Sequence, residues 1–264
     1  AGALIEIGRV SGGIHATGLT NAFGILAWSD AAYATNPATV RVGALDGTVS
    51  ANVKPGGAVA AAVCARTSVE LTLASGAVMF GGTYGWDTGD GSATNAAKVL
   101  RALLSKVKAR TATAAESNTL VSASSEGYAV LGGTGTDAVC FASENVAVFG
   151  KVALGGGYDT VTLAGIAPGK SLALPPVVDV ELLAVTNCPD VAVSNAAGFA
   201  ELYVGDNALC RLSDPAYTVA GLYGSGTVAP QGTLEVTNRI EVSRFGGAPT
   251  GSTLTVTGNL TLGT

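Results

Sequence analysis

The sequence has little charge and no long hydrophobic run. Only 12% of its 264 residues are charged, whereas ordinary soluble domains contain roughly 25%. Because a subunit packed against neighbours needs fewer surface charges than a free monomer, this composition favours assembly with other subunits. Even the apolar run 58–64 is far shorter than the ~20 residues that a membrane-spanning helix requires. We therefore expect no membrane span.

The sequence is also poor in the residues that build most catalytic and metal centres. Its single histidine, His15, has no serine-nucleophile motif near it, and we interpret it as a structural histidine beside a turn. The four cysteines form no C-x-x-C pair, which argues against zinc and redox sites. Buried thiols are the simplest interpretation, and a disulfide between Cys188 and Cys210 is the alternative. We expect a non-enzymatic protein without a cofactor or metal.

Basic residues are sparse, and the net charge is −5. Direct binding to nucleic acid relies on clustered positive charge, so we expect none. The glycine-rich stretch 132–137 lacks both the third glycine of a dinucleotide site and the lysine of a phosphate loop. We interpret it as a turn between strands.

Short apolar runs, separated by Gly, Asn, Asp and Pro, fill the first two thirds of the chain. They are typical of strands joined by turns. The run VELTL at 69–73 alternates apolar and polar residues, which predicts a half-buried strand. These signals predict a β-sandwich or barrel-like domain over 1–174. The stiff pair Pro175 and Pro176 then marks a domain boundary.

One segment has the periodicity of a helix. Over 92–110, with Ser92, Thr94 or Asn95 as the N-cap, apolar residues recur three and four positions apart. This pattern predicts a single amphipathic helix that covers a sheet. The polar segment 111–125 that follows is expected to be a linker. The basic side of the helix is either a solvated face or a contact with an acidic neighbouring subunit, and it carries Lys98, Arg101 and Lys108.

The last third of the chain contains a repeated pattern. The frame L-x-x-L-x-L-x-x-N/C-x-L is matched twice, 19 residues apart, at Phe199, Leu202, Val204, Asn207 and Leu209 and at Val180, Leu183, Val185 and Cys188. The segments 234–239 and 254–259 match its centre in part. The pattern resembles the leucine-rich repeat family, particularly the irregular versions of bacterial surfaces and bacteriophage fibres.

The resemblance covers 179–264 and implies a domain of stacked coils, in which Asn207 satisfies backbone groups at a bend. A generic β-solenoid and a β-sandwich with coincidental matches are the alternatives. Because alternate residues of a strand point to opposite sides, the repeat predicts an inner set, Leu183, Leu202 and Leu254. It also predicts an exposed strand face for partner binding, made of Ala184, Tyr203, Glu235 and Thr255.

These features favour a structural virion protein, such as a bacteriophage capsid, decoration or tail component, which assembles with copies of itself and other structural subunits. The alternative is an extracellular or bacterial cell-surface adhesin, or a repeat module that binds a host-surface glycan or protein. A polysaccharide-degrading β-solenoid enzyme is a third class. It would be favoured if acidic residues gathered on one face of the repeat domain.

Overall fold

The computed structural model describes residues 3–28, 37–196, 198–246, 253–256 and 259–260. The chain divides into two compact units, unit 1 with residues 1–137 and 145–157, and unit 2 with residues 138–144 and 158–264. The sequence placed a boundary at Pro175 and Pro176, a pair that lies inside unit 2. Neither helix in the described part of the chain has the length and apolar character needed to cross a membrane.

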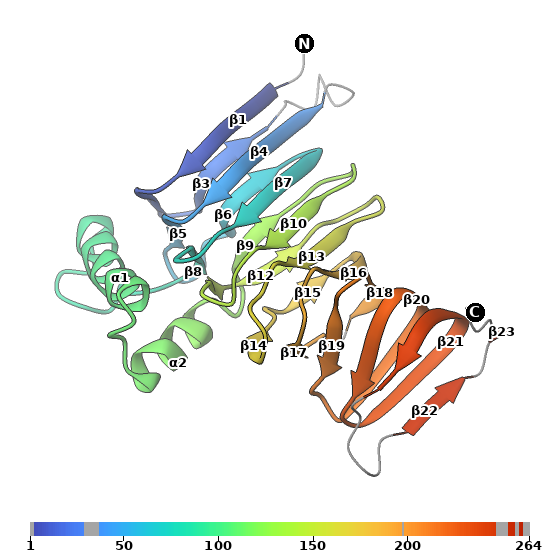
Figure 1. Ribbon diagram of the computed structural model, residues 1–264. Coiled ribbons are helices and arrows are strands. Elements are labelled where there is room, and N and C mark those ends of the chain that lie inside the picture. The colour runs from blue at the N-terminus through green and yellow to red at the C-terminus, as the bar shows by residue number, and fades with distance from the viewer. Residues whose placement is uncertain (1–2, 29–36, 197, 247–252, 257–258, 261–264) are drawn as a thin grey trace. The chain divides into compact units, whose positions relative to one another are not determined.

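Unit 1 consists of short strands and two helices (Figure 1). The helices are α1 (Ala93–Lys108) and α2 (Ala114–Ala123). The strands are β1 (Ala3–Val10), β2 (Gly13–Gly18), β3 (Asn21–Ala27), β4 (Ala38–Leu45), β5 (Thr48–Val53), β6 (Val59–Ala65), β7 (Ser68–Leu73), β8 (Val78–Gly82), β9 (Tyr128–Leu131), β11 (Ala147–Phe149) and β12 (Lys151–Ala153).

These strands form three parallel ladders. The first ladder is β1-β4-β7, the second is β2-β5-β8-β11 and the third is β3-β6-β9-β12. The chain visits the three ladders in turn, so Ile5 pairs with Val40 and Val40 pairs with Val69. The predicted β-rich character is confirmed. A sandwich or barrel of consecutive strands is not confirmed, because neighbouring strands come from successive circuits of the chain.

Small and β-branched residues let the ladders of unit 1 approach closely. Ala51 and Val53 of β5 pack against Ala22 of β3 and Ala60 of β6 in one buried cluster. Strand β7 shows the alternation predicted for 69–73, because Val69, Leu71 and Leu73 are buried while their neighbours are more exposed. The first ladder therefore has one buried face and one solvated face.

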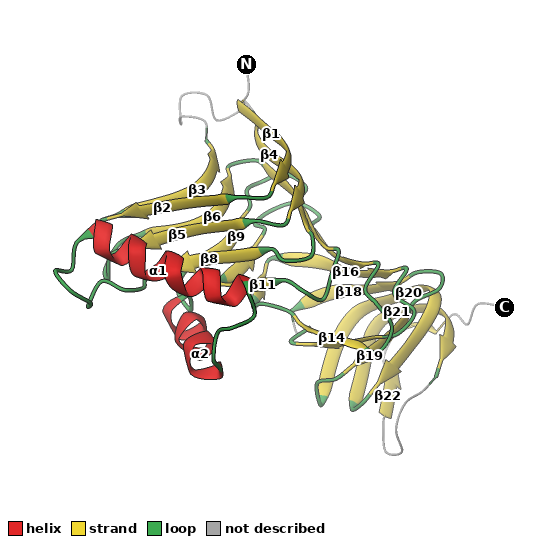
Figure 2. Ribbon diagram, turned by 60° about the vertical axis from the view of Figure 1, so that its left-hand side comes forward, coloured by secondary structure: helices red, strands yellow, loops and turns green. Residues whose placement is uncertain are grey.

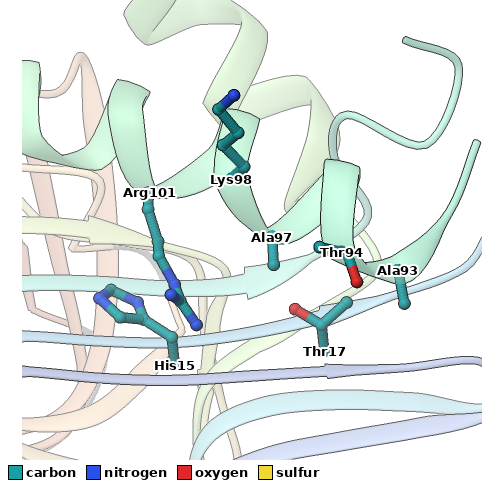
Figure 3. Close-up of a pocket in the computed structure, with 7 residues that line it drawn as sticks. All are labelled: His15, Thr17, Ala93, Thr94, Ala97, Lys98 and Arg101. Atoms are coloured by element: carbon teal, nitrogen blue, oxygen red, sulfur yellow. The ribbon is translucent and has the colours of Figure 1, made fainter. Parts of the chain in front are cut away.

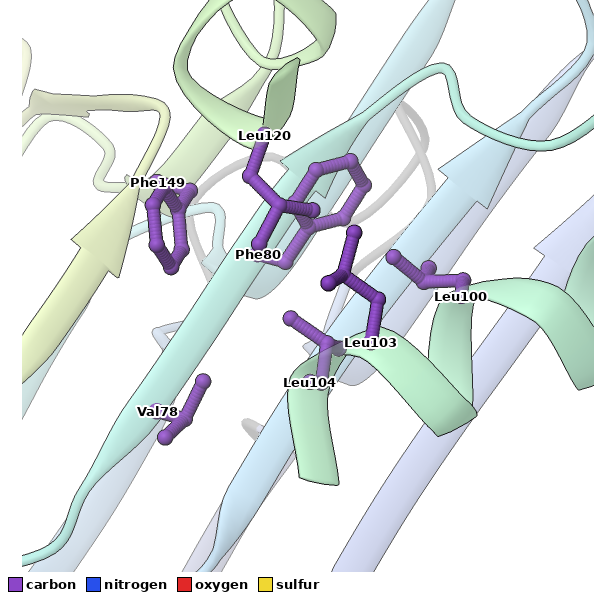
Figure 4. Close-up of a cluster of buried hydrophobic side chains, with 7 residues drawn as sticks. All are labelled: Val78, Phe80, Leu100, Leu103, Leu104, Leu120 and Phe149. Atoms are coloured by element: carbon purple, nitrogen blue, oxygen red, sulfur yellow. The ribbon is translucent and has the colours of Figure 1, made fainter. Parts of the chain in front are cut away.

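Helix α1 covers one face of the second ladder (Figure 2). It begins after Ser92, whose hydroxyl accepts a hydrogen bond from the Asn95 backbone N–H at 3.2 Å. Its buried side packs on the second ladder in an apolar cluster (Figure 4), with members Leu100, Leu103, Leu104, Val78 and Phe80. The predicted amphipathic helix over 92–110 is confirmed.

Helix α2 lies where the sequence predicted a polar linker, and the prediction of a single helix is therefore wrong. Thr113 caps α2, and the Glu116 carboxylate accepts a hydrogen bond from the Thr113 backbone N–H at 2.8 Å, which completes a capping box. Glu116 also contacts Lys106 of α1 at 2.5 Å. Leu120 alone is fully buried in α2, so the helix has little of the apolar periodicity that a sequence pattern relies on.

The glycine-rich stretch 132–137 forms a turn between strands, as predicted. Hydrogen bonds to the Asp137 side chain stabilise this turn. The fully buried Asp137 carboxylate accepts hydrogen bonds from the Val69 backbone N–H and, at 3.3 Å, from that of Gly133. A Cβ on Gly133 would stand 1.8 Å from the Arg66 carbonyl oxygen, so only glycine fits this close approach.

Unit 2 consists of parallel ladders without helices in its described part. Its strands are β10 (Ala138–Phe141), β13 (Thr160–Ala164), β14 (Lys170–Ala173), β15 (Val177–Val178), β16 (Val180–Thr186), β17 (Val191–Ser194), β18 (Phe199–Val204), β19 (Leu209–Leu212), β20 (Ala216–Pro230), β21 (Thr233–Phe245), β22 (Thr253–Val256) and β23 (Asn259–Leu260).

Two ladders of unit 2 converge on the long strand β20. The main ladder is β10-β13-β16-β18-β20, and the side ladder is β14-β17-β19-β20. Residues 221–223 of β20 pair with β18, and residues 227–230 pair with β19. Gly224 lies between them at φ +117°, and a Cβ there would stand 2.1 Å from the Val204 carbonyl oxygen. Glycine therefore lets one strand serve both ladders.

The ladder register agrees with the spacing of the repeat. Leu183 pairs with Leu202, and each side chain is 2% exposed.

The prediction that Leu254 lies inside is wrong, because Leu254 is 38% exposed and β22 pairs only with β21 in the described residues. Ala184, predicted on the exposed face, is 7% exposed. Its methyl group stands between the larger side chains of its ladder partners, Thr162 and Tyr203, which explains its burial.

The side chain of Asn207 was predicted to hydrogen-bond backbone groups at a bend, but the structure gives this residue a different role. Asn207 is exposed, and its backbone has φ +57°, a left-handed conformation that asparagine tolerates. Asn187 takes the same conformation one circuit earlier, with φ +51°. The buried thiol of Cys188 instead donates to the Thr186 carbonyl oxygen at 3.3 Å. All four cysteines are free, so Cys188 and Cys210 are not bridged.

Candidate functional site

The basic residues of α1 border a groove in unit 1. Lys98 and Arg101 line a hollow of about 530 Å³ between α1 and β2, opposite His15 and Thr17 (Figure 3). Lys108 lines an adjoining hollow of about 230 Å³. The two hollows are adjacent, because His15 and Arg101 line both, and we call them together the α1–β2 groove.

His15 forms a hydrogen bond with the neighbouring strand in the wall of the α1–β2 groove. Its Nδ1 atom lies 2.7 Å from the Ser50 hydroxyl on β5. Burial, followed by the nearby charge of Arg101, lowers the pKa of the imidazole below its ordinary value of 6.5. A Cβ on Gly13 would stand 2.6 Å from the His15 Nε2 atom, so the glycine makes room for the ring. His15 therefore enters the groove as a neutral imidazole near pH 7.

The three basic side chains differ in their surroundings. Figure 3 shows the Arg101 guanidinium beside His15, whereas the Lys98 ammonium points away from the strands. The Lys108 ammonium donates to the Asp46 carbonyl oxygen at 2.6 Å. All three residues are exposed, and no carboxylate is among the described residues that line the groove. The groove is thus a basic surface with hydroxyl-bearing walls.

A second cluster of polar side chains lies on the main ladder of unit 2. One carboxylate oxygen of Glu201, Oε2, accepts hydrogen bonds from the Tyr158 hydroxyl at 2.6 Å and from the Tyr223 hydroxyl at 2.9 Å. The hydrogen bond to Glu201 raises the pKa of Tyr158. Burial, followed by the hydrogen bonds with Tyr158 and with Glu201, raises the pKa of Tyr223. Both hydroxyls therefore remain protonated donors at neutral pH.

Tyr203 extends this cluster along the ladder. It pairs with Tyr223, and the two ring centroids are 5.5 Å apart with a 53° tilt. Tyr158 is 47% exposed, and Tyr203 and Tyr223 are half-buried. We call Tyr158, Glu201, Tyr203 and Tyr223 the Tyr–Glu face. It offers ring surfaces, hydroxyl groups and a carboxylate within reach of one ligand.

The other residues of the predicted strand face lie elsewhere on the ladders. Ala184 is the ladder partner of Tyr203. Glu235 pairs with Thr255 on a separate stretch of β21 and β22, where Glu235 is half-buried and Thr255 is exposed. The structure therefore brings Ala184 and Tyr203 together, and Glu235 and Thr255 together, as two separate pairs.

Sequence reasoning missed Tyr158, Glu201 and Tyr223. The available signal was the motif A-x-L-Y, which occurs at 200–203 and again at 220–223. A spacing close to the repeat length predicts that the two tyrosines stack. Tyr158 has no counterpart in such a motif, because it precedes β13 outside the repeat pattern.

The described residues contain no group of three or more His, Cys, Asp or Glu side chains that could hold a metal ion. A comparison of the chain with protein-family models, curated proteins and solved structures gave no match.

Proposed function

We propose that the chain is a non-enzymatic binding and structural module built from stacked β-solenoid circuits, and that the Tyr–Glu face binds a glycan. The observation that carries this proposal is the convergence of two tyrosine hydroxyls on one Glu201 oxygen beside the Tyr203 ring. Tyrosine rings provide large apolar contact area with few rotatable bonds. A carboxylate with free lone pairs accepts hydrogen bonds from sugar hydroxyl groups.

The setting that we favour is a virion, with the chain as a bacteriophage capsid, decoration or tail component. Its low charge suits a subunit that packs against other copies. Its repeat spacing resembles that of leucine-rich repeats in bacteriophage fibres. A cell-surface adhesin is the second candidate, and the same Tyr–Glu face supports it, because adhesion also requires an exposed binding face.

A polysaccharide-degrading enzyme would use two acidic side chains at the bound sugar. Glu181 contributes with Glu201 to the raised pKa of Tyr158, so both carboxylates act on the same tyrosine. Glu181, however, accepts a hydrogen bond from the Asp159 backbone N–H at 2.7 Å, and Glu201 accepts two tyrosine hydroxyls. Hydrogen bonds from the chain thus hold both carboxylates in place, as in a preformed binding surface.

The proposal is tested by screening the wild-type protein against a panel of purified oligosaccharides, with binding and product formation recorded in parallel. Tyr203→Ala is expected to abolish binding without unfolding the protein. Trp28→Ala is the matched control, because Trp28 is an exposed aromatic residue of unit 1. Equal binding by the wild type and Tyr203→Ala would contradict the proposal. Cleavage of a bound oligosaccharide would replace it with the enzymatic alternative.

A further inference from the structure

We propose that the α1–β2 groove is a binding site for an oxyanion, the phosphate or carboxylate group of a small polar molecule. This site lies in unit 1 and does not depend on the Tyr–Glu face. It would give the module a second binding site, which is lined by basic side chains, whereas the Tyr–Glu face carries the acidic Glu201.

Arg101 is the centre of the proposed site, because it lines the groove without a carboxylate partner. Four arginines of the chain each contact a carboxylate, in the pairs Arg9–Asp46, Arg41–Glu70, Arg211–Asp190 and Arg239–Glu241. Arg101 forms no ion pair in the part of the chain that the structure describes, and it lines a groove without carboxylates. A guanidinium group presents a planar fork of donors that matches phosphate and carboxylate oxygens.

The walls of the groove supply further donors on both sides of Arg101. Thr17 of β2 and Thr94 of α1 line the larger hollow, and Thr48 of β5 lines the smaller one. Lys108 donates one hydrogen bond to Asp46, so its ammonium group has two further donors. A volume of about 530 Å³ falls within the range of small-molecule sites. A polar molecule can therefore hydrogen-bond both walls while its anion contacts Arg101.

His15 couples the proposed site to pH. The charged groups that line the groove with it are Arg101, Lys98 and Lys108, and β5 contributes the Ser50 and Thr48 hydroxyls. A bound anion offsets the charge of Arg101, which is one of the two causes that hold the His15 pKa down. By linkage, binding favours the protonated imidazole of His15, and the affinity for a carboxylate strengthens as the pH falls through the His15 pKa.

The test is calorimetric titration of the full chain with inorganic phosphate and with glucuronate, and with glucose as the uncharged comparison, all at one ionic strength. The wild type is expected to bind one of the two anions saturably and glucose not at all. The anion that binds tells phosphate from carboxylate. Arg101→Gln is expected to weaken binding roughly tenfold or more, since a hydrogen-bonded charge is lost.

Two further variants separate a shaped site from general attraction. Arg110→Gln removes the same charge from an exposed position outside the groove and is expected to leave affinity unchanged. Ala97→Leu keeps every charge and the helix propensity of α1, but it places a larger side chain in the groove wall. It is expected to abolish binding.

Absence of saturable anion binding by the wild type at millimolar concentrations would overturn the proposal. Equal weakening by Arg101→Gln and Arg110→Gln would overturn it too, because general charge attraction would then be the cause. So would an unchanged affinity in Ala97→Leu. If Arg101→Gln instead lowers the mass of the native particle, the basic face contacts an acidic subunit and the small-molecule site is wrong.

Discussion

Tyr203 and Tyr223 are direct partners in the parallel ladder of β18 and β20, although 20 residues separate them in the sequence. Their rings lie on the outer side of the ladder with centroids 5.5 Å apart. Leu202 and Leu222, the residues just before them, are also partners and are buried on the inner side. One repeat length therefore produces both a stacked core and a stacked outer face.

This arrangement predicts opposite consequences for neighbouring substitutions. Leu202→Ala should lower the free energy of unfolding by about 2–5 kcal/mol, because Leu202 is 2% exposed and its loss leaves a cavity. Tyr203→Ala should change stability by much less, since the ring is half-buried. Urea denaturation followed by circular dichroism measures both. A larger loss from Tyr203→Ala than from Leu202→Ala would reverse the assigned faces.

A second prediction concerns the start of α2. The hydrogen bond from Lys106, followed by that from the Thr113 backbone N–H, lowers the pKa of Glu116 from 4.5 to about 2. Because the folded-state pKa is depressed, this carboxylate stabilises the protein fully above about pH 4.5. The contribution is lost as the pH falls from there toward about 2. Glu116→Gln, which retains a capping-box residue, should be less stable than the wild type at pH 7.

The stability difference between the wild type and Glu116→Gln should shrink over the same acid range. Thermal melts at a series of pH values measure it. Glu6→Gln is the control, because Glu6 is exposed and forms no ion pair in the described part of the chain. A difference between Glu116→Gln and the wild type that stayed constant down to pH 2 would contradict the proposed role of the charge.

The third prediction concerns assembly. The low content of charged residues leads us to expect a native particle of several copies, with a mass that is a multiple of 25.9 kDa. Light scattering coupled to size-exclusion chromatography measures this mass directly. A single species of 25.9 kDa at all concentrations tested would argue against a self-assembling virion subunit. The adhesin alternative would then be preferred.

The sequence predicted those elements whose pattern is carried by local periodicity. The helix over 92–110 followed from apolar residues on one side, and the half-buried strand at 69–73 followed from strict alternation. The pairing of Leu183 with Leu202 followed from a spacing of 19 residues. In each case the residues that contact one another are either a few positions apart in the sequence or separated by a fixed repeat length.

The elements that were missed depend on contacts between distant segments. The parallel ladders of unit 1 join strands such as β4 and β7, whose pairing no local pattern reveals. Helix α2 has one fully buried residue and therefore no apolar periodicity. The capping-box residues Thr113 and Glu116 were the only sequence signal for this helix. The three basic residues of α1 were identified, but their groove needs His15 from the opposite wall. The exposure of Leu254 depends on which other strands pack against β22, and the repeat pattern does not specify this packing.

The central claim is that the Tyr–Glu face binds a glycan, and tyrosine-specific NMR tests it most directly. With ¹³C-labelled tyrosine, and signals assigned through single Tyr→Phe variants, the oligosaccharide found in the screen is titrated into the protein. We predict that the signals of Tyr158, Tyr203 and Tyr223 shift together and saturate at one affinity, while those of Tyr84 and Tyr128 in unit 1 do not move. Saturable binding that leaves Tyr158, Tyr203 and Tyr223 unshifted would contradict the account.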